Sequence, residues 1–499
     1  MSGNFFADLH GVFVENASRP CFIFSRGGGW SFADLEDRIG GACGALLRAG
    51  VRPGNRVVAQ IDKSPEAVVL YLASLRVGAV YVPLNTAYTT SEVEYFIDDA
   101  KPALFVCGPD VVADNPHGAI HTLDGEGEGS FAYAMTHTEP FTGVIARKKN
   151  DVAAILYTSG TTGRSKGAML THENLRANAM ATSACWQWEE RDVLLHTLPI
   201  FHVHGLFIAL HCALLNGTTT IFAQGFDVAE MLEWLPRATV MMGVPTYYSR
   251  LLKDPRFGPK SCQGVRLFIS GSAPLTEQAH MEFEERTGQK ILERYGMSEA
   301  IVITTNPLDG ERIAGTVGYA LPGVQVRITT NEGVPVAPGE IGMIEVRGHS
   351  LFSGYWQMPE KTAEEMRSDG FFITGDLGTQ TADGRLTIVG RSKDLIISGG
   401  YNVYPKEVEQ ALDEVAGVAE SAVFGVPHAD FGEAVVAAIV PSVEDVSQAS
   451  VDAALASSLA RFKQPKRVIN LVELPRNTMG KVQKNKLREI YADLFEQTS

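Results

Sequence analysis

A short segment rich in Gly, Thr and Ser carries the strongest chemical signal in the sequence. It begins at Thr158 and reads Thr-Ser-Gly-Thr-Thr-Gly-Arg-Ser-Lys-Gly. Glycines let the backbone approach an anion and present successive N–H groups to it, while hydroxyl groups add donors and Arg164 and Lys166 add positive charge. The segment therefore predicts a phosphate-binding loop, which we expect to follow a strand and to precede a helical segment. The candidate phosphate ligands are Thr158, Ser159, Gly160, Thr161, Thr162, Gly163 and Lys166.

Other interpretations of this loop are less consistent with its composition. It is not a Walker A loop, because Ser165 stands where that motif requires a Gly next to the Lys. Gly163-Arg-Ser-Lys-Gly167 matches the nucleophile elbow of hydrolases, which would make Ser165 a nucleophile. The flanking hydroxyl groups and cations have no use in an elbow and suit phosphate, so phosphate binding is the preferred hypothesis over an elbow or a plain surface loop.

The phosphate-loop segment and six further segments resemble motifs of the acyl-adenylate-forming enzymes, and they follow one another in the order found in that family. The family comprises acyl- and aryl-CoA synthetases, peptide-synthetase adenylation domains and luciferases. The resemblance covers nearly the whole chain, and the ordered set is far more specific than any single motif. The six segments are 198–205, 267–274, 293–299, 374–378, 390–394 and 475–484.

The resemblance implies a site for ATP and Mg²⁺. It implies that Tyr295 stacks on adenine and that Asp376 and Arg391 contact the ribose, since one carboxylate can accept two hydroxyl hydrogen bonds. It also implies that Glu299, with Thr158, holds Mg²⁺, a hard cation that prefers oxygen ligands. Further implied nucleotide contacts are Lys166, Gly271, Ser272, Ala273, Glu293, Gly296, Met297 and Ser298, the last of which replaces the usual Thr and keeps its hydroxyl.

The same resemblance implies a two-step reaction with a domain movement between the steps. Lys481 is expected to reach the carboxylate and the α-phosphate during adenylation, and the C-terminal part to rotate about Lys393 before CoA attacks. The segment Gly399, Gly400 and Tyr401 is expected to shape the CoA tunnel. The residues expected to take part in catalysis are Lys481, Glu299, Lys166, Thr158 and His202.

The expected acyl pocket contains basic side chains. Arg294 stands where many members of the family have Gly, and Arg250 lies on another segment that lines the pocket in the family. A neutral acyl chain needs an apolar lining, whereas a guanidinium group binds a carboxylate through two hydrogen bonds. With His202 and His204, these arginines favour a small acid with a second carboxylate.

Three segments make this hypothesis more specific, because they are similar to the corresponding segments of the malonyl-CoA synthetases. They span residues 266–275, 293–297 and 475–484. The resemblance implies malonate as the substrate, with methylmalonate possible. The alternative is that Arg294 and Arg250 form structural ion pairs, for instance with Glu293 or Glu299.

Other functions remain open at this level. A synthetase for a short monocarboxylate such as acetate would use the same adenylation chemistry. A module that loads a carrier protein would transfer the acyl group to a bound pantetheine arm instead of free CoA. A nucleotide sensor without catalysis would have no need of Lys481.

The elements that position these residues alternate between helices and apolar strands. Helices are expected over 31–49 and 65–77, and strands over 56–61 and 79–83, which predicts an α/β fold with largely parallel sheets. We expect a large N-terminal domain over 1–392, with a small β-rich subdomain over about 320–392. A smaller, mobile α+β domain is expected over 393–499, with helices near 405–415 and 450–462.

The composition excludes several partner classes. The net charge of −15 disfavours nucleic acid and anionic membranes. No apolar run predicts a membrane span, and the first residues do not resemble a secretory signal. The six cysteines show no C-x-x-C pair, as expected for reduced thiols of a cytoplasmic protein. We expect a monomer or weak oligomer whose partners are a small dicarboxylate, ATP and CoA.

Overall fold

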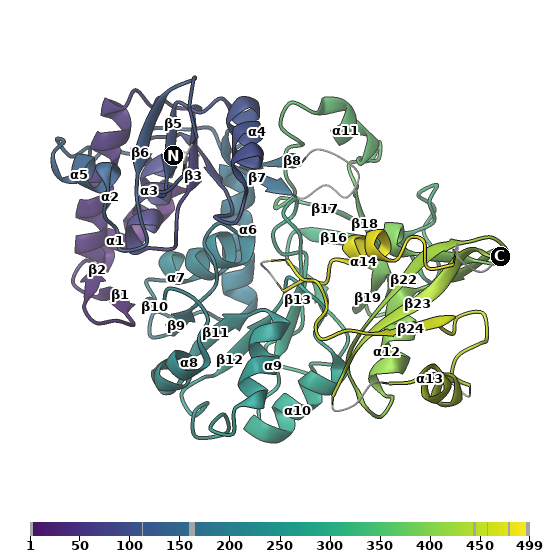
Figure 1. The fold of residues 1–499 in the computed structure, drawn as a ribbon. Coiled ribbons are helices and arrows are strands. Elements are labelled where there is room, and N and C mark those ends of the chain that lie inside the picture. The colour runs from purple at the N-terminus through teal and green to yellow at the C-terminus, as the bar shows by residue number, and fades with distance from the viewer. Residues whose placement is uncertain are drawn as a thin grey trace.

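The computed structural model describes residues 3–111, 113–158, 165–442, 446–456, 458–477 and 480–495. Strands of the described residues form four sheets, and helices pack against them (Figure 1). Two sheets are mainly parallel and two are mainly antiparallel, which confirms the predicted α/β class.

The first large sheet has the strand order β6-β5-β3-β4-β7-β8, and only β8 runs antiparallel to its neighbour. Its strands are β3 Arg56–Gln60, β4 Val80–Pro83, β5 Leu104–Cys107, β6 Ala119–Thr122, β7 Val152–Thr158 and β8 Lys166–Thr171. The accompanying helices are α2 Phe32–Arg48, α3 Pro65–Arg76, α4 Thr90–Ala100 and α5 Ser130–Thr136.

The second sheet follows the order β15-β14-β13-β12-β11-β9-β10-β1-β2. Its strands are β1 Pro20–Phe24, β2 Gly29–Ser31, β9 Val193–His196, β10 Thr219–Phe222, β11 Val240–Gly243, β12 Leu267–Ser270, β13 Leu292–Tyr295, β14 Thr304–Thr305 and β15 Tyr319–Ala320. Its helices are α1 Phe6–Glu15, α6 His172–Cys185, the π-helix η1 His204–Leu210, α7 His211–Leu215, α8 Val228–Trp234, the short η2 Leu235–Arg237, α9 Pro245–Lys253 and α10 Glu277–Thr287. Strands β9, β11, β12 and β13 run in parallel, so their carboxyl ends meet at one edge, where ligands of open α/β sheets bind.

The two smaller sheets lie beside each other in the C-terminal half (Figure 1). The third sheet comprises β16 Val324–Thr329, β17 Gly342–Gly348, β18 Phe372–Gln380 and β19 Leu386–Arg391, with α11 Pro359–Glu364 between β17 and β18. The fourth comprises β20 Ile396–Ser398, β21 Tyr401–Val403, β22 Val418–His428, β23 Gly432–Pro441 and β24 Arg467–Asn470. It is accompanied by η3 Ser392–Asp394, α12 Pro405–Asp413, α13 Gln448–Leu455 and α14 Lys484–Ile490. The domain boundary between 392 and 393 stays a prediction.

Local sequence explains where several elements begin and end. Ser31 caps α2, because its hydroxyl accepts the Asp34 N–H at 3.1 Å and the Asp34 carboxylate accepts the Ser31 N–H at 2.8 Å. α13 ends at Leu455, earlier than predicted, and the Ser458 hydroxyl donates to the Leu455 carbonyl. Serine side chains that bond to nearby carbonyls compete with helical structure.

One prediction about the phosphate loop was wrong. The loop leads into strand β8, which pairs antiparallel with β7 and places Thr158 opposite Lys166, and not directly into a helix. The helix α6 starts only at His172, after Thr171 and Asn174 have formed a capping box. The loop therefore joins two strands of a hairpin.

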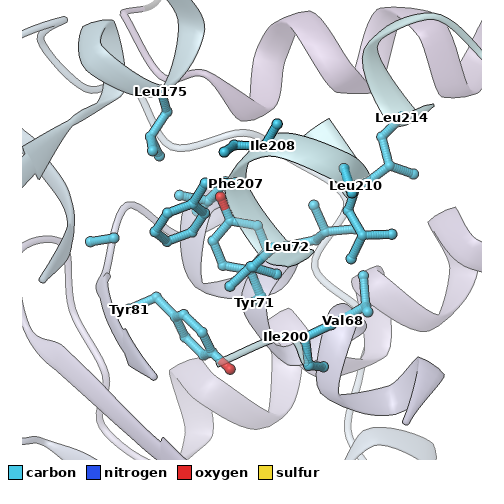
Figure 2. Close-up of a cluster of buried hydrophobic side chains, with 14 of the residues drawn as sticks. Val68, Tyr71, Leu72, Tyr81, Leu175, Ile200, Phe207, Ile208, Leu210 and Leu214 are labelled. Atoms are coloured by element: carbon cyan, nitrogen blue, oxygen red, sulfur yellow. The ribbon is translucent and has the colours of Figure 1, made fainter. Parts of the chain in front are cut away.

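A buried aromatic cluster anchors the π-helix η1 (Figure 2). Tyr71 of α3 lies between Tyr81 of β4 and Phe207 of η1, with ring centroids 5.1 and 5.6 Å apart, and its hydroxyl lies 2.7 Å from His211 Nε2. Because these contacts fix η1, they also fix its first residue, His204, at the edge of the site.

No helix among the described residues is long and apolar enough to cross a membrane.

Candidate active site

Asp376 forms the centre of a polar cluster between the second and third sheets. Its carboxylate pairs with Arg391 Nε at 2.7 Å and accepts the Tyr295 hydroxyl at 2.5 Å, while its backbone N–H donates to the Thr374 hydroxyl. Burial and the nearby Asp376 carboxylate raise the pKa of Tyr295, so its phenol stays protonated. The structure thus brings together three residues that the family resemblance assigns to one nucleotide.

The phosphate loop is described only at its two ends. Thr158 closes β7 and Lys166 opens β8, and the Thr158 hydroxyl donates to the Lys166 carbonyl at 3.4 Å. The other five candidate ligands, Ser159, Gly160, Thr161, Thr162 and Gly163, lie outside the described residues.

Lys166 and Glu299 are connected by two residues that the sequence analysis missed. Lys166 Nζ lies 2.9 Å from Glu365 Oε1 and 3.2 Å from the Tyr355 hydroxyl. That hydroxyl also lies 3.0 Å from Glu299 Oε1 and 2.7 Å from Glu365 Oε2. Burial raises the pKa of Glu299, which is 5% exposed. Tyr355 and Glu365 belong to no motif that we recognised, so only the fold reveals them.

Small residues line the carboxyl end of β12. Gly271 lies so close to Arg294 that an added Cβ would be 2.5 Å from the guanidinium carbon, and Ser272 adopts a positive φ of 72°. Ala273 follows in the same turn. On β13, the buried Glu293 faces His280, with 3.5 Å between Oε1 and Nδ1.

The turn after β13 is tightly packed. A Cβ on Gly296 would lie 1.9 Å from the Ile301 carbonyl oxygen, so no side chain fits there. Met297 accepts the N–H of Ile301 at 2.7 Å, which closes the turn around the half-buried Ser298 and brings Glu299 back toward the cluster.

Arg294 is the most unusual charge in the site. Its side chain is 5% exposed, and among the described residues its Nε and Nη2 have no hydrogen-bond partner. Burial lowers the pKa of Arg294 to about 9. The described residues provide it with no ion pair, so neither Glu293 nor Glu299 has the structural role considered above. A buried cation without a counter-charge is costly and is expected to bind an anion.

His202 and His204 lie within the electrostatic influence of Arg294. Burial and the charge of Arg294 together lower the pKa of His202 to about 4. The pKa of His204 is also lowered, first by burial and then by Arg294. His202 Nδ1 accepts the His204 backbone N–H at 3.3 Å, and Ser272 Oγ lies 3.3 Å from His204 Nδ1. Both imidazoles are therefore neutral near pH 7, and Arg294 supplies the positive charge.

Arg250 is exposed on α9, and its guanidinium carbon lies 6.0 Å from the centre of the Phe226 ring. Tyr248, Leu251 and Leu252 form the buried face of the same helix. The place of Arg250 in the acyl pocket stays a prediction from the sequence.

The segment that carries Lys481 docks against the N-terminal part of the chain. Gly480 has a positive φ of 73°, and a Cβ there would lie 2.9 Å from the Thr246 hydroxyl oxygen at the start of α9. The Lys481 N–H donates to Asn477 Oδ1 at 3.0 Å. The Lys481 side chain keeps an exposed surface, yet desolvation lowers its pKa and Arg391 lowers it further, with Asp376 acting in the opposite direction. Lys481 is thus an electrostatic neighbour of the Asp376 cluster.

The expected hinge and the CoA segment lie at the start of the fourth sheet. Lys393 belongs to η3, and the next residue, Asp394, pairs with Arg488 of α14 at 2.9 Å. Gly399 and Gly400, with φ of 58° and 81°, form the turn between β20 and β21. Tyr401 is 60% exposed, and its ring packs against Phe462 of the same domain.

Gly480→Ala is expected to slow adenylation about 10-fold. A non-glycine residue in the left-handed region costs roughly 1–2 kcal/mol, and the new methyl group would also press on Thr246. Acid-dependent pyrophosphate release measures the effect. Gly339→Ala is the matched control, because Gly339 has a φ of 89° but open space around it. Equal rates for the two variants would show that the docking contact has no role.

Comparison with known proteins identifies the family and the overall fold. The family described as AMP-binding enzyme matches residues 13–356, and the AMP-binding enzyme C-terminal domain matches residues 407–481. The structure is similar to that of ATP-bound MatB from Rhodopseudomonas palustris, with 49% identity, a TM-score of 0.96 and coverage of 99% of this chain and 100% of that chain.

Curated relatives with different substrates show similar identity. The malonate–CoA ligase of Mus musculus is 35% identical over 85% of this chain and 79% of its own length. The long-chain-fatty-acid–CoA ligase of Bacillus subtilis is 33% identical over 88% of this chain and 86% of its own length. The overall sequence identity to these relatives therefore does not indicate which acid this chain uses as its substrate.

Proposed function

The chain belongs to the family of AMP-binding enzymes, and we propose that it converts malonate and CoA to malonyl-CoA, AMP and pyrophosphate, with ATP as the second substrate and an acyl-adenylate as the intermediate. The observation that carries the choice of acid is the buried Arg294, whose Nε and Nη2 have no partner among the described residues. The malonate–CoA ligases of Mus musculus and Arabidopsis thaliana among the relatives support the same choice.

The pocket around Arg294 suits one carboxylate of a short diacid. A guanidinium group binds a carboxylate through two parallel hydrogen bonds, and burial strengthens this pairing. Gly271 gives Arg294 room against the backbone, and the neutral His202 and His204 provide hydrogen-bonding groups beside it. The second carboxylate of the acid would then face the nucleotide. The proposal covers methylmalonate as well, because one methyl group changes binding by only about 1–3 kcal/mol.

The residues present fit a magnesium ion bound together with phosphate. Mg²⁺ is usually held by one or two carboxylates and by phosphate oxygens, and not by a cage of protein ligands. The described residues contain no cluster of three or more potential metal-binding side chains, but they do contain the buried carboxylate of Glu299. Glu299, with Thr158, would hold Mg²⁺, which supplies positive charge to the phosphates when bound.

Several residues of the chain would each have a separate role in the adenylation step. Asp376 and Arg391 hold the ribose, and Lys166 and the phosphate loop bind the phosphates. Lys481 approaches the acid carboxylate and the α-phosphate, where two anions must meet, so its charge stabilises the transition state electrostatically. The carboxylate oxygen attacks the α-phosphorus and pyrophosphate leaves.

The second step requires Lys481 to withdraw. We propose that rotation about Lys393 brings the segment Gly399, Gly400 and Tyr401 to the site, where it lines the path of CoA. The CoA thiolate then attacks the acyl carbonyl and AMP leaves. A movement of this kind is often the slow step of turnover.

The first test measures CoA-dependent AMP formation with Mg-ATP and acetate, propionate, malonate, methylmalonate or succinate. We expect malonate to give the highest kcat/KM, by at least 10-fold over the monocarboxylates. A preference for acetate or propionate would replace the proposal by a monocarboxylate synthetase, and transfer only to a carrier pantetheine arm would indicate a loading module. A cytoplasmic location and a monomeric or weakly oligomeric state stay predictions from the sequence.

A further inference from the structure

Tyr355 is held between strand β8 and helix α11. The segment around it pairs with β8, because Met169 N–H donates to the Gly354 carbonyl at 3.0 Å and Trp356 N–H donates to the Gly167 carbonyl at 2.7 Å. The Tyr355 N–H donates to Thr362 Oγ1 at 2.8 Å. The side chain is 2% exposed, so its hydroxyl has a single defined place.

The Tyr355 hydroxyl lies within hydrogen-bond distance of one cationic and two anionic side chains. Lys166 Nζ lies 3.2 Å away and can donate to it, while Glu299 Oε1 and Glu365 Oε2 lie 3.0 and 2.7 Å away. A phenol has one hydrogen, so it donates to one carboxylate at a time. Lys166 Nζ also lies 4.3 Å from the centre of the Tyr355 ring, which adds a cation–π contact.

Glu365 completes the network from the end of α11. Its Oε1 accepts from Lys166 at 2.9 Å and lies 3.3 Å from Lys361 Nζ. Its backbone is fixed to the third sheet, because Ile373 N–H donates to the Glu365 carbonyl at 2.8 Å. A lysine ammonium on a flexible stem needs such partners to keep one position.

We propose that Tyr355 is a positioning residue that links the phosphate-loop Lys166 to the carboxylate of Glu299, with Glu365 as the anchor of both Tyr355 and Lys166. This inference rests on the proposed function, because it assumes that Lys166 and Glu299 meet the triphosphate of ATP and its Mg²⁺. Partners of this kind orient a metal-binding carboxylate, and their loss typically costs 10- to 100-fold in metal affinity or activity.

Nucleotide binding by calorimetry tests the proposal without involving the acid. The probes are Mg²⁺ with α,β-methylene-ATP, which carries three phosphates, and AMP, which carries one. Tyr355→Phe is expected to weaken binding of the triphosphate about 10-fold and to leave AMP binding within about twofold, because AMP lacks the phosphates that Lys166 and Glu299 would meet. Tyr319→Phe is the matched control, since Tyr319 donates to Asp383 at 2.9 Å on the surface of the same part of the chain.

Glu365→Ala provides the sharper second variant. Removal of a negative charge should by itself favour an anionic nucleotide, so weaker triphosphate binding by this variant reports lost positioning of Lys166. Tighter triphosphate binding by Glu365→Ala, unchanged binding by Tyr355→Phe, or an equal loss for AMP and the triphosphate would overturn the proposal. Failure of the unmodified protein to bind either nucleotide would instead overturn the proposed function.

Discussion

Lys481→Ala is expected to slow acyl-adenylate formation by about 100- to 1,000-fold while it leaves transfer from a supplied acyl-adenylate to CoA nearly unchanged. The structure places Lys481 beside the charges of Arg391 and Asp376, on a segment that docks through Gly480 against Thr246. Under the proposed mechanism, this cation reduces the repulsion between the acid carboxylate and the α-phosphate as they approach each other. Once AMP is attached to the acyl group, the repulsion between the carboxylate and the α-phosphate no longer exists. The rate of transfer to CoA is therefore expected to change little.

The two half-reactions are measured separately. Pyrophosphate release with the acid and ATP reports adenylation, and CoA-dependent release of AMP from a supplied acyl-adenylate reports transfer. Lys486→Ala is the matched control, because Lys486 is an exposed lysine of the following helix α14 and its removal changes the net charge equally. If Lys481→Ala slowed both half-reactions to the same degree, Lys481 would be a structural residue and not an adenylation residue.

The resemblance to the acyl-adenylate-forming enzymes pointed to Tyr295, Asp376 and Arg391, and the structure places the three side chains in contact. Tyr295 closes β13, and Asp376 and Arg391 face each other on the neighbouring strands β18 and β19. The fold class followed from the residues themselves, because helices alternate with apolar strands along the chain.

Other features depended on packing that local sequence does not encode. Tyr355 meets Lys166 because a segment after β17 pairs with β8, which is a contact between residues nearly 190 positions apart. That Nε and Nη2 of Arg294 find no hydrogen-bond partner among the described residues likewise depends on all the elements packed around this side chain. Neither property leaves a periodic pattern that a reader of the sequence could use.

The error about the phosphate loop had a usable signal in the sequence. Thr171 and Asn174 mark the start of α6, and their capping box leaves room for strand β8 between the phosphate loop and the helix. Capping residues would have corrected this prediction.

Arg294→Met is expected to lower kcat/KM for malonate by about 100-fold or more and to change kcat/KM for acetate or propionate by only a few-fold. Loss of one partner of a buried, hydrogen-bonded charge pair costs roughly 2–5 kcal/mol, and each 1.4 kcal/mol corresponds to a factor of 10. Methionine fills much of the space of the arginine stem without its charge, so the packing beside Gly271 is largely kept. AMP formation at saturating Mg-ATP and CoA measures all three acids.

Arg250→Met is the matched control for this prediction. It removes the same charge from an arginine that is exposed on α9 and lies near Phe226, so we expect a much smaller loss of malonate use than at position 294. The substitution at position 294 distinguishes two causes of lost activity. Loss of electrostatic recognition lowers kcat/KM for a diacid and leaves that for a monoacid nearly unchanged, whereas damage to the fold lowers both. An equal loss for malonate and acetate would make Arg294 a packing residue, and an unchanged preference for malonate would place recognition of the second carboxylate elsewhere in the pocket.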